Sequence, residues 1–208
     1  MTTYLDDIRV SYDTVAADYA RIVDSGFPEE LPILTNFASL VGAGGQVLDA
    51  GCGPGRVTAL LRSLGLDAFG IDLSPGMIEV ARRDHPELRF EVGSMTALDL
   101  PDGELGGIVS WWSVIHLPSE ALAEAFAEFH RVLAPGGRLL VGFHVGTDST
   151  HKTSGYGGHP MSVHVHRRTP EQISAVAADA GFVLQTTIGL DLDGDRPGAC
   201  LLFDKEDS

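Results

Sequence analysis

The chain has 208 residues, 44% of them hydrophobic and 21% charged, a balance typical of a globular domain that buries its own core. Fourteen basic and 29 acidic residues give a formal charge of −15. Nucleic acids and anionic membranes need an electropositive surface, so this charge disfavours both as partners and favours a small molecule.

The first 42 residues are expected to be helical. Two apolar stripes at helical spacing indicate this: Tyr12, Val15, Ala16, Tyr19, Ile22 and Val23, and then Ile33, Leu34, Phe37 and Val41. Both stripes precede the first predicted strand. We therefore expect the two helices to pack as a lid over an edge of the sheet.

Residues 43–145 alternate between strand and helix patterns. Short apolar runs predict five strands, at 46–50, 67–72, 88–93, 106–112 and 138–143. Helical stripes follow the first, second and fourth of these runs, at 57–64, 75–81 and 119–133. Such alternation predicts an α/β fold with a doubly wound, mostly parallel sheet and helices on both faces.

The rest of the chain adds a polar segment and a closing unit. Residues 146–162 are rich in glycine and show no repeating pattern. A capping box at 169–172 starts a helix that ends at Gly181. The apolar runs at 182–190 and 198–204 are joined by a turn-rich segment, so we expect an antiparallel hairpin at one edge of the sheet.

The loop after the first strand, 50-AGCGPG-55, is the candidate ligand site. Ligands of open parallel sheets bind outside the carboxyl ends of the strands, and glycines let the main chain approach a ligand. The spacing is GxGxG, with Arg56 where a dinucleotide fingerprint has its third glycine, and no P-loop lysine is near. Asp72 ends the second strand roughly 20 residues later, where a carboxylate can accept from ribose hydroxyls. These features indicate a nucleoside ligand without a pyrophosphate.

Four segments in this order resemble the successive motifs of class I S-adenosylmethionine-dependent methyltransferases. They are VLDAGCGPGRVTALL, GIDLSPGMIEVAR, FEVGSMTALDLPDGELGGIVSWWSVIHL and EFHRVLAPGGRLLVGF. The resemblance is close over 43–145, and the N-terminal SYDTVAADYA is similar to the family's lid helix. It implies seven strands, mostly parallel with an antiparallel last strand, in a Rossmann-like fold. It divides one domain into a helical lid (1–42), a cofactor-binding core (43–145), a substrate flap (146–168) and a closing helix and hairpin (169–208).

The resemblance also implies a cofactor, S-adenosylmethionine, with S-adenosylhomocysteine as product. Gly51, Cys52 and Gly53 would lie along its methionine part, and Asp49 would help to hold the ammonium group. Asp72 would bind the ribose hydroxyls. The remaining residues placed at the cofactor are Leu73, Met77, Ser94 and Met95 at the adenine, and Tyr12 and Tyr19 closing over it. The stretch 111–116, with Trp111 and His116, would border the sulfonium and the substrate. The family usually has Asp where this chain has Ser94.

Several of these residues have a simpler explanation. Tyr12 and Tyr19 lie on a helical stripe and are core residues by default, and Met77 also suits ordinary helix packing. One of the two adjacent tryptophans is expected in the core, because alternate strand residues face opposite sides. The small size of its side chain is a better explanation for a cysteine at position 52 than thiol reactivity is.

Five of the eight histidines lie between 144 and 166, and three interpretations are open. They can be solvated residues of a polar flap, one can act as a general base or substrate anchor, or His164 and His166 can ligate a metal. As a catalytic base we favour His116 or His144, since each lies at a strand's carboxyl end. The neighbouring Arg167 and Arg168 can anchor an acidic substrate or form a solvated strand end.

The leading function is methyl transfer from S-adenosylmethionine to a small-molecule acceptor by in-line displacement. The alternatives are a non-catalytic protein that binds S-adenosylmethionine and a nicotinamide oxidoreductase. Two isolated cysteines, Cys52 and Cys200, and an N-terminus without the features of a secretory signal predict a cytoplasmic location. The sequence does not identify the acceptor or the oligomeric state.

Overall fold

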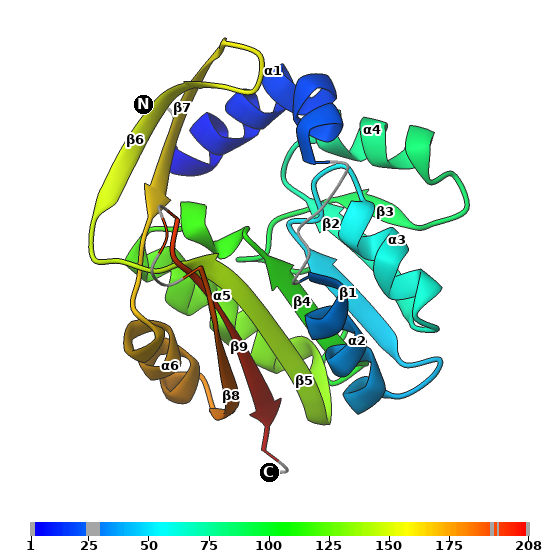
Figure 1. Cartoon of the computed structure of the whole chain (residues 1–208). Helices are drawn as coiled ribbons and strands as arrows, with labels where there is room; N and C mark the ends of the chain where they lie inside the picture. The colour runs from blue at the N-terminus through cyan, green and yellow to red at the C-terminus, as the bar shows by residue number, and fades with distance from the viewer. Residues whose placement is uncertain (1–2, 24–29, 192–193, 195, 207–208) are drawn as a thin grey trace.

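The computed structural model describes residues 3–23, 30–191, 194 and 196–206. At its centre is a seven-stranded sheet with the order β3-β2-β1-β4-β5-β9-β8 (Figure 1). The first five strands of this order pair in parallel, whereas β9 is antiparallel to both of its neighbours. The strands are β1 (Gln46–Ala50), β2 (Asp67–Asp72), β3 (Phe90–Val92), β4 (Leu105–Trp111), β5 (Leu133–His144), β8 (Phe182–Leu190) and β9 (Gly198–Lys205). The predicted fold class is confirmed.

Helices cover both faces of this sheet. One face packs against α2 (Glu30–Val41) and α3 (Arg56–Ser63), and the other packs against α5 (Ser119–Val132) and α6 (Pro170–Asp179). The strands are consequently apolar on both sides. In β1, for example, Val47 joins the cluster with α2 and α3, and Leu48 joins the cluster with α5.

A second, two-stranded sheet lies above the carboxyl edge of the large one (Figure 1). It is an antiparallel ribbon of β6 (Ser149–Gly155) and β7 (His159–His166), where the sequence predicts no regular element over 146–162. The pattern is hard to find because β6 consists of serine, threonine, histidine, lysine and glycine. Only β7 shows alternation, with Met161 and Val163 buried between exposed residues.

The two N-terminal helices occupy different places. Helix α1 (Tyr4–Val23) stands over the carboxyl edge, between the ribbon and α4 (Pro75–Asp84) (Figure 1). Helix α2 instead covers a face of the sheet, where Leu34 and Phe37 are fully buried. Of the two helices, only α1, with the ribbon packed against it, stands over the carboxyl edge of the sheet, where the sequence predicts a lid. The difference follows from composition, because α2 is apolar enough to become a core helix, whereas α1 buries only Ser11, Val15 and Ala16.

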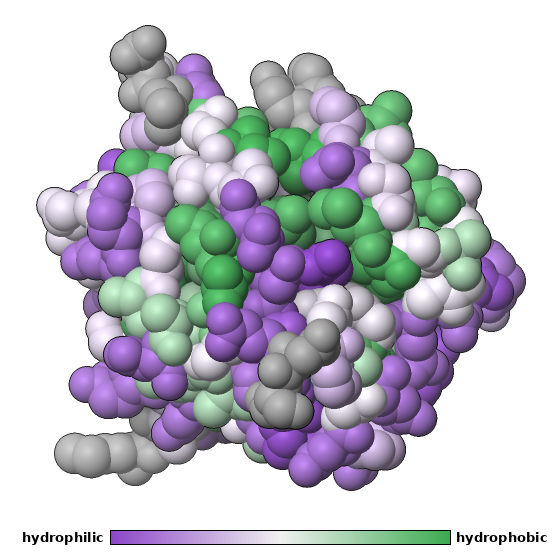
Figure 2. All heavy atoms as spheres, turned by 90° about the horizontal axis from the view of Figure 1, so that it is seen from below, coloured by the Kyte–Doolittle hydropathy of each residue, from purple (hydrophilic) through white to green (hydrophobic). Residues whose placement is uncertain are grey.

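Elsewhere the surface is mixed in character. Seen from below, the face opposite α1 and the ribbon shows hydrophobic residues broken up by hydrophilic ones (Figure 2). In the described ranges, no helix is long and apolar enough to cross a membrane. The predicted turn between the last two strands is described only in part, since residues 192, 193 and 195 lie outside the described residues.

A buried ion pair ties α2 to the start of α3. The Arg56 guanidinium donates to both carboxylate oxygens of Glu30, with 2.6 Å between Nη2 and Oε2. The Glu30 side chain is 3% exposed, so the pair is held in a region of low dielectric.

We expect Glu30→Gln to lower the free energy of unfolding by about 3 kcal/mol, because it leaves a largely buried guanidinium without its counter-ion. This is the lower end of the usual range because Arg56 keeps 23% of its side chain exposed. Urea denaturation measures the loss. The control is Glu91→Gln, which breaks the exposed pair with Arg89 and should cost less than about 1 kcal/mol. Equal losses in the two variants would contradict the prediction.

Candidate active site

A cavity opens at the carboxyl edge of the sheet, beneath α1. Its empty volume is about 710 Å³, including the open mouth, which is within the usual size of a small-molecule site. The described residues that line it come from α1, from the ends of β2 and β4, from the loops after β1, β2, β3 and β4, from the first turn of α4, and from the short 3₁₀ helix η1 (Val114–His116) and its end. They are Leu5, Ile8, Tyr12, Tyr19, Gly51, Gly53, Asp72, Leu73, Met77, Gly93, Ser94, Met95, Trp111, Trp112, Ser113, His116 and Leu117.

Asp72 joins two loops at the edge of this cavity. Its Oδ2 accepts the backbone N–H of Gly53 at 2.9 Å, and its Oδ1 accepts that of Ser74 at 2.9 Å. Burial raises the pKa of this carboxyl to about 6, although the two N–H donors work in the opposite direction. Each oxygen keeps a free lone pair, so an ionised Asp72 can accept two further hydroxyl groups.

Two of the loop's three glycines, Gly51 and Gly53, line the cavity, and each has a different reason to be glycine. Gly51 has φ +79°, and a Cβ built there would lie 2.4 Å from the Cβ of Ser113. Ser113 is itself fixed, because its hydroxyl donates to the Ala50 carbonyl at 2.6 Å. Gly53 has φ +53° and only Tyr19 nearby, at 3.8 Å from the Cβ position. Gly51 is therefore needed for packing, and Gly53 for a backbone turn that carries an N–H to Asp72.

Asp49 is a buried carboxylate behind the same loop. It is 1% exposed, and its Oδ2 accepts the hydroxyl of Thr58 on α3 at 2.7 Å. Its Oδ1 is buried and has no hydrogen-bond partner among the described residues. Burial raises the pKa of Asp49 to about 7. A buried carboxylate oxygen without a donor suits a cationic or hydrogen-bonding ligand group, which would restore its ionised form.

The imidazole of His116 links three elements at one side of the cavity, namely η1, α1 and β7. The Nδ1 of His116 lies 2.8 Å from the carbonyl oxygen of His164 on β7, and its Nε2 lies 2.6 Å from the hydroxyl of Tyr12 on α1. A carbonyl only accepts, so Nδ1 carries the proton, and Nε2 accepts from Tyr12. Burial lowers the pKa of His116 to about 4. A role as base would require the Tyr12 hydroxyl to move away or to relay the proton.

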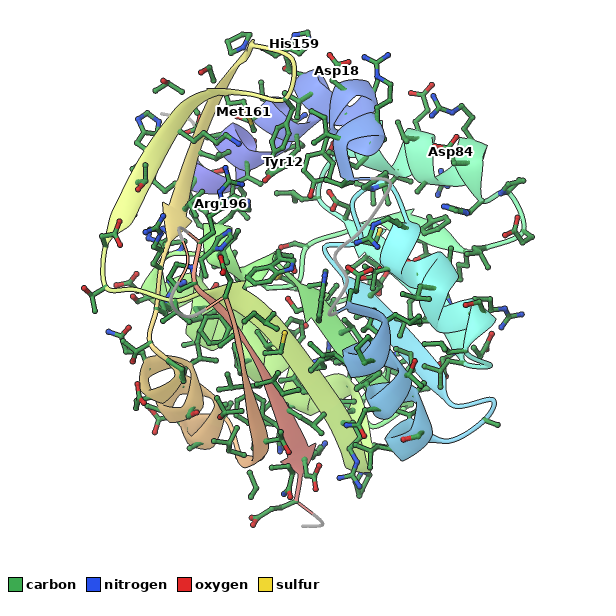
Figure 3. All side chains as sticks on the ribbon, in the orientation of Figure 1. Tyr12, Asp18, Asp84, His159, Met161 and Arg196 are labelled. Carbon is green, nitrogen blue, oxygen red and sulfur yellow. The ribbon has the colours of Figure 1, made fainter. Side chains whose placement is uncertain are left out.

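The ribbon closes on α1 through further polar and aromatic contacts. The Nε2 of His159 lies 2.6 Å from the Oδ2 of Asp18, and the two meet where the turn of the ribbon reaches α1 (Figure 3). Tyr156, in the same turn, packs edge-on against Tyr19 at 4.6 Å between ring centroids. Figure 3 shows Met161 and Tyr12 farther along the same contact.

The two tryptophans differ in environment. Trp111 is 8% exposed and belongs to the core on the α2 side, yet it also lines the cavity. Trp112 is half-buried and has φ +55°, a conformation that costs energy for a bulky residue. His144 does not line the cavity, because its ring stacks behind Trp112 with 4.9 Å between centroids.

The structure brings together most of the residues expected at the cofactor. Eleven line the cavity: Tyr12, Tyr19, Gly51, Gly53, Asp72, Leu73, Met77, Ser94, Met95, Trp111 and His116. Three of the predicted site residues do not, namely Asp49, Cys52 and His144. Cys52 is 7% exposed and packs against Gly70, and burial raises the pKa of its thiol well above the usual value. The functional roles of all these residues, inside and outside the cavity wall, stay predictions.

Sequence reasoning missed part of the cavity wall. Leu5 and Ile8 come from α1, Gly93 follows β3 and Leu117 follows η1. Ile8 could have been found, because it continues the helical stripe of Tyr12 by one turn. Trp112 and Ser113 belong to the stretch 111–116 that the sequence places beside the sulfonium and the substrate, but nothing in the sequence indicates that Trp112 adopts a left-handed conformation.

Three of the four histidines of the ribbon, His151, His164 and His166, form a stacked row on its outer face. His164 lies 4.7 Å from His151 across the ribbon and 6.0 Å from His166, between ring centroids. Within the described part of the chain, no group of three or more His, Cys, Asp or Glu side chains is placed to hold a metal ion. Arg168, expected as a solvated strand end or a substrate anchor, is 9% exposed and donates to the carbonyl of Leu117.

Residues 47–137 match the family model described as a methyltransferase domain. The chain is 35% identical over 97 residues to malonyl-[acyl-carrier protein] O-methyltransferase of Serratia marcescens, with 47% of this chain and 37% of that protein covered. It is 30% identical over 141 residues to demethylmenaquinone methyltransferase of Renibacterium salmoninarum, covering 65% and 58%. The chain thus spans less than two thirds of the length of these relatives.

Solved structures share the fold. One is a Burkholderia thailandensis 1,6-didemethyltoxoflavin-N1-methyltransferase with bound 1,6-didemethyltoxoflavin and S-adenosylhomocysteine. It aligns with a TM-score of 0.77 at 20% identity, covering 100% of this chain and 92% of that one. At this level of identity the likeness concerns the fold alone.

We expect His116 to stay neutral, with its proton on Nδ1, until the pH falls to about 4. The reason is that protonation would place a charge in a buried site whose Nε2 already accepts from Tyr12. Long-range ¹H–¹⁵N NMR spectra recorded against pH report both the tautomer and the pKa. Tyr12→Phe should leave the tautomer unchanged, since the His164 carbonyl sets it. A titration near the ordinary value of about 6.5 would contradict the arrangement.

Proposed function

The chain belongs to the class I methyltransferases, and from that premise we propose that it transfers the methyl group of S-adenosylmethionine to a small-molecule acceptor. The observation that carries the proposal is the placement of Asp72. Its carboxylate faces the cavity at the end of β2, with both oxygens oriented by backbone N–H groups and with the glycine loop beside it.

The described residues fit this cofactor along its length. Asp72 would accept hydrogen bonds from both ribose hydroxyls, as expected for a nucleoside ligand that has no pyrophosphate. The unpartnered Oδ1 of Asp49 would receive the ammonium group, directly or through water. Leu73 and Met77 offer the adenine an apolar surface, and Ser94 offers a hydroxyl where the family usually has a carboxylate. Tyr19 would lie over the methionine part, next to Gly53.

Catalysis would depend mainly on positioning. When bound, S-adenosylmethionine supplies a methyl group on a positively charged sulfur, which an acceptor oxygen, nitrogen, sulfur or carbon can attack in line. The chain's own part is to align the acceptor and to exclude water; α1 lines the cavity and would exclude water from it, with the ribbon packed against α1. The faces of Tyr12 and Trp111 would stabilise positive charge nearby. His116 would hold the Tyr12 hydroxyl in place.

A small acceptor suits the enclosed cavity and the formal charge of −15. Two of the similar proteins are named for small-molecule substrates, demethylmenaquinone and 1,6-didemethyltoxoflavin, whereas a third is named for a malonyl group on an acyl-carrier protein. We include a cytoplasmic location in the proposal, supported by two free, buried cysteines, Cys52 and Cys200. That nucleic acid is not a partner stays a prediction from charge.

Turnover decides between an enzyme and a binding protein. The protein is incubated with methyl-labelled S-adenosylmethionine and a panel of phenols, amines, thiols and carboxylic acids. We expect labelled product with at least one acceptor. Binding of the cofactor without transfer to any acceptor would favour the non-catalytic alternative, and binding of NAD instead would favour the oxidoreductase.

We expect Asp72→Ala to weaken binding of S-adenosylhomocysteine by at least about tenfold, because each lost hydrogen bond to a charged group is worth roughly 1.5–3 kcal/mol. Isothermal titration calorimetry measures the change. The matched control is Asp67→Ala, at the exposed opposite end of the same strand, which should bind as the wild type does. Equal affinity in all three proteins would refute the assignment of Asp72.

Binding should also depend on pH in a defined direction. The pKa values of Asp49 and Asp72 are raised to about 7 and about 6, so both become neutral as the pH falls through these values. S-adenosylhomocysteine needs both carboxylates ionised, so its affinity should fall in that range. 5′-Methylthioadenosine lacks the ammonium group, so its affinity should fall only as the pH passes the pKa of Asp72, about 6. Calorimetry at several pH values tests this, and a flat profile for both ligands would contradict it.

A further inference from the structure

The inner face of the ribbon carries one lysine, Lys152, and one histidine, His159, in its described strands, and His159 is already paired with Asp18 of α1. Lys152 on β6 pairs with Val163 on β7, and cross-strand partners share a face. Val163 is 1% exposed and packs, with Met161, against Val15 and Ala16 of α1. The side chain of Lys152 therefore lies on the face turned toward α1, whereas the stacked histidines lie on the other.

No described carboxylate neutralises this ammonium group. The ion pairs found in the described ranges do not include Lys152. Its Nζ instead lies 3.9 Å from the centroid of the Tyr156 ring, and that ring packs against Tyr19 in the cavity wall. The chain has only two lysines against 29 acidic residues, and the other one, Lys205, donates to two backbone carbonyls.

Lys152 also lies close to His116 of the cavity wall. Burial is the main cause that lowers the pKa of His116, and the charge of Lys152 lowers it further. Of the nearby acids, Asp18 is already engaged by His159 and Arg21. Lys152 is thus a cation near the cavity without a described carboxylate partner, and it would attract an anion.

The remaining wall on the acceptor side is apolar. It consists of Leu5, Ile8, Trp112 and Leu117. Resting on the proposed function, we propose that Lys152 binds an anionic group of the acceptor, so that the acceptor is a small acid with an apolar body and a carboxylate or phosphate group. Lys152 is a specificity-determining residue in this proposal. It does not line the cavity itself, and the ring of Tyr156, which packs against Tyr19 of the cavity wall, would hold its ammonium group beside the cavity until the anion arrives.

The test compares charged and neutral probes of one shape. Benzoate, phenyl phosphate and benzamide are titrated by calorimetry into the protein saturated with S-adenosylhomocysteine. We expect at least one of the two anions to bind about tenfold or more tightly than benzamide, and the stronger anion tells a carboxylate acceptor from a phosphate one. Lys152→Met, which can still pack on Tyr156, should abolish the preference, and Lys152→Arg should keep it.

Arg83→Met is the control for net charge, because it removes an exposed cation with 63% of its side chain accessible, on α4. It should preserve the preference for anions. Equal binding of all three probes to the wild type, no binding by either anion, or a preference that survives Lys152→Met would each overturn the proposal. So would a Lys152→Met variant that weakens S-adenosylhomocysteine but not 5′-methylthioadenosine, since Lys152 would then bind the cofactor's carboxylate. If S-adenosylhomocysteine itself fails to bind, the proposed function fails separately, and the probes are compared on the free protein.

Discussion

The arrangement of the cavity depends on one carboxylate at the end of β2. Asp72 accepts the N–H of Gly53 from the preceding loop and that of Ser74 from its own, so a single side chain fixes two loops against each other. Ser74 is also the N-cap of α4, and its hydroxyl donates to Asp13 of α1 at 2.6 Å. The position of the lid helix is thus set from the same point as the glycine loop. A ligand bound to Asp72 would therefore affect the positions of both α1 and the glycine loop.

Helix α1 and the ribbon are held together by polar contacts between residues that are far apart in the sequence. His116 connects α1 to the ribbon through its two nitrogens, and His159 makes a second connection to Asp18. Few apolar residues support these contacts, since the cluster between α1, α4 and β7 is small compared with the two clusters of the sheet. Regions with little buried apolar surface open at lower free energy than cores do. The cover over the cavity is therefore the part of the molecule best suited to admit and release ligands.

The core of the fold and the cofactor side could be read from the sequence, because both depend on strong local patterns. β1 and β2 are continuous apolar runs, and Asp72 and the glycines follow them at fixed spacing. The acceptor side could not be read in the same way. β6 has no apolar side chain, and α1 packs mainly against the neighbouring strand β7. The conformation of Trp112 and the separation of α2 from the lid are set by tertiary packing, which no local pattern encodes.

The place of β9 in the sheet has a consequence for the nascent chain during its synthesis. β9 is the last strand of the chain, yet it lies between β5 and β8 and contributes Cys200, Leu201 and Phe203 to the buried layers. Until it leaves the ribosome, β5 presents an unpaired edge and β8 has no neighbour in the sheet. Exposed edges of this kind invite pairing with other chains. Nascent chains that end before residue 198 should therefore need chaperones more than the finished protein does.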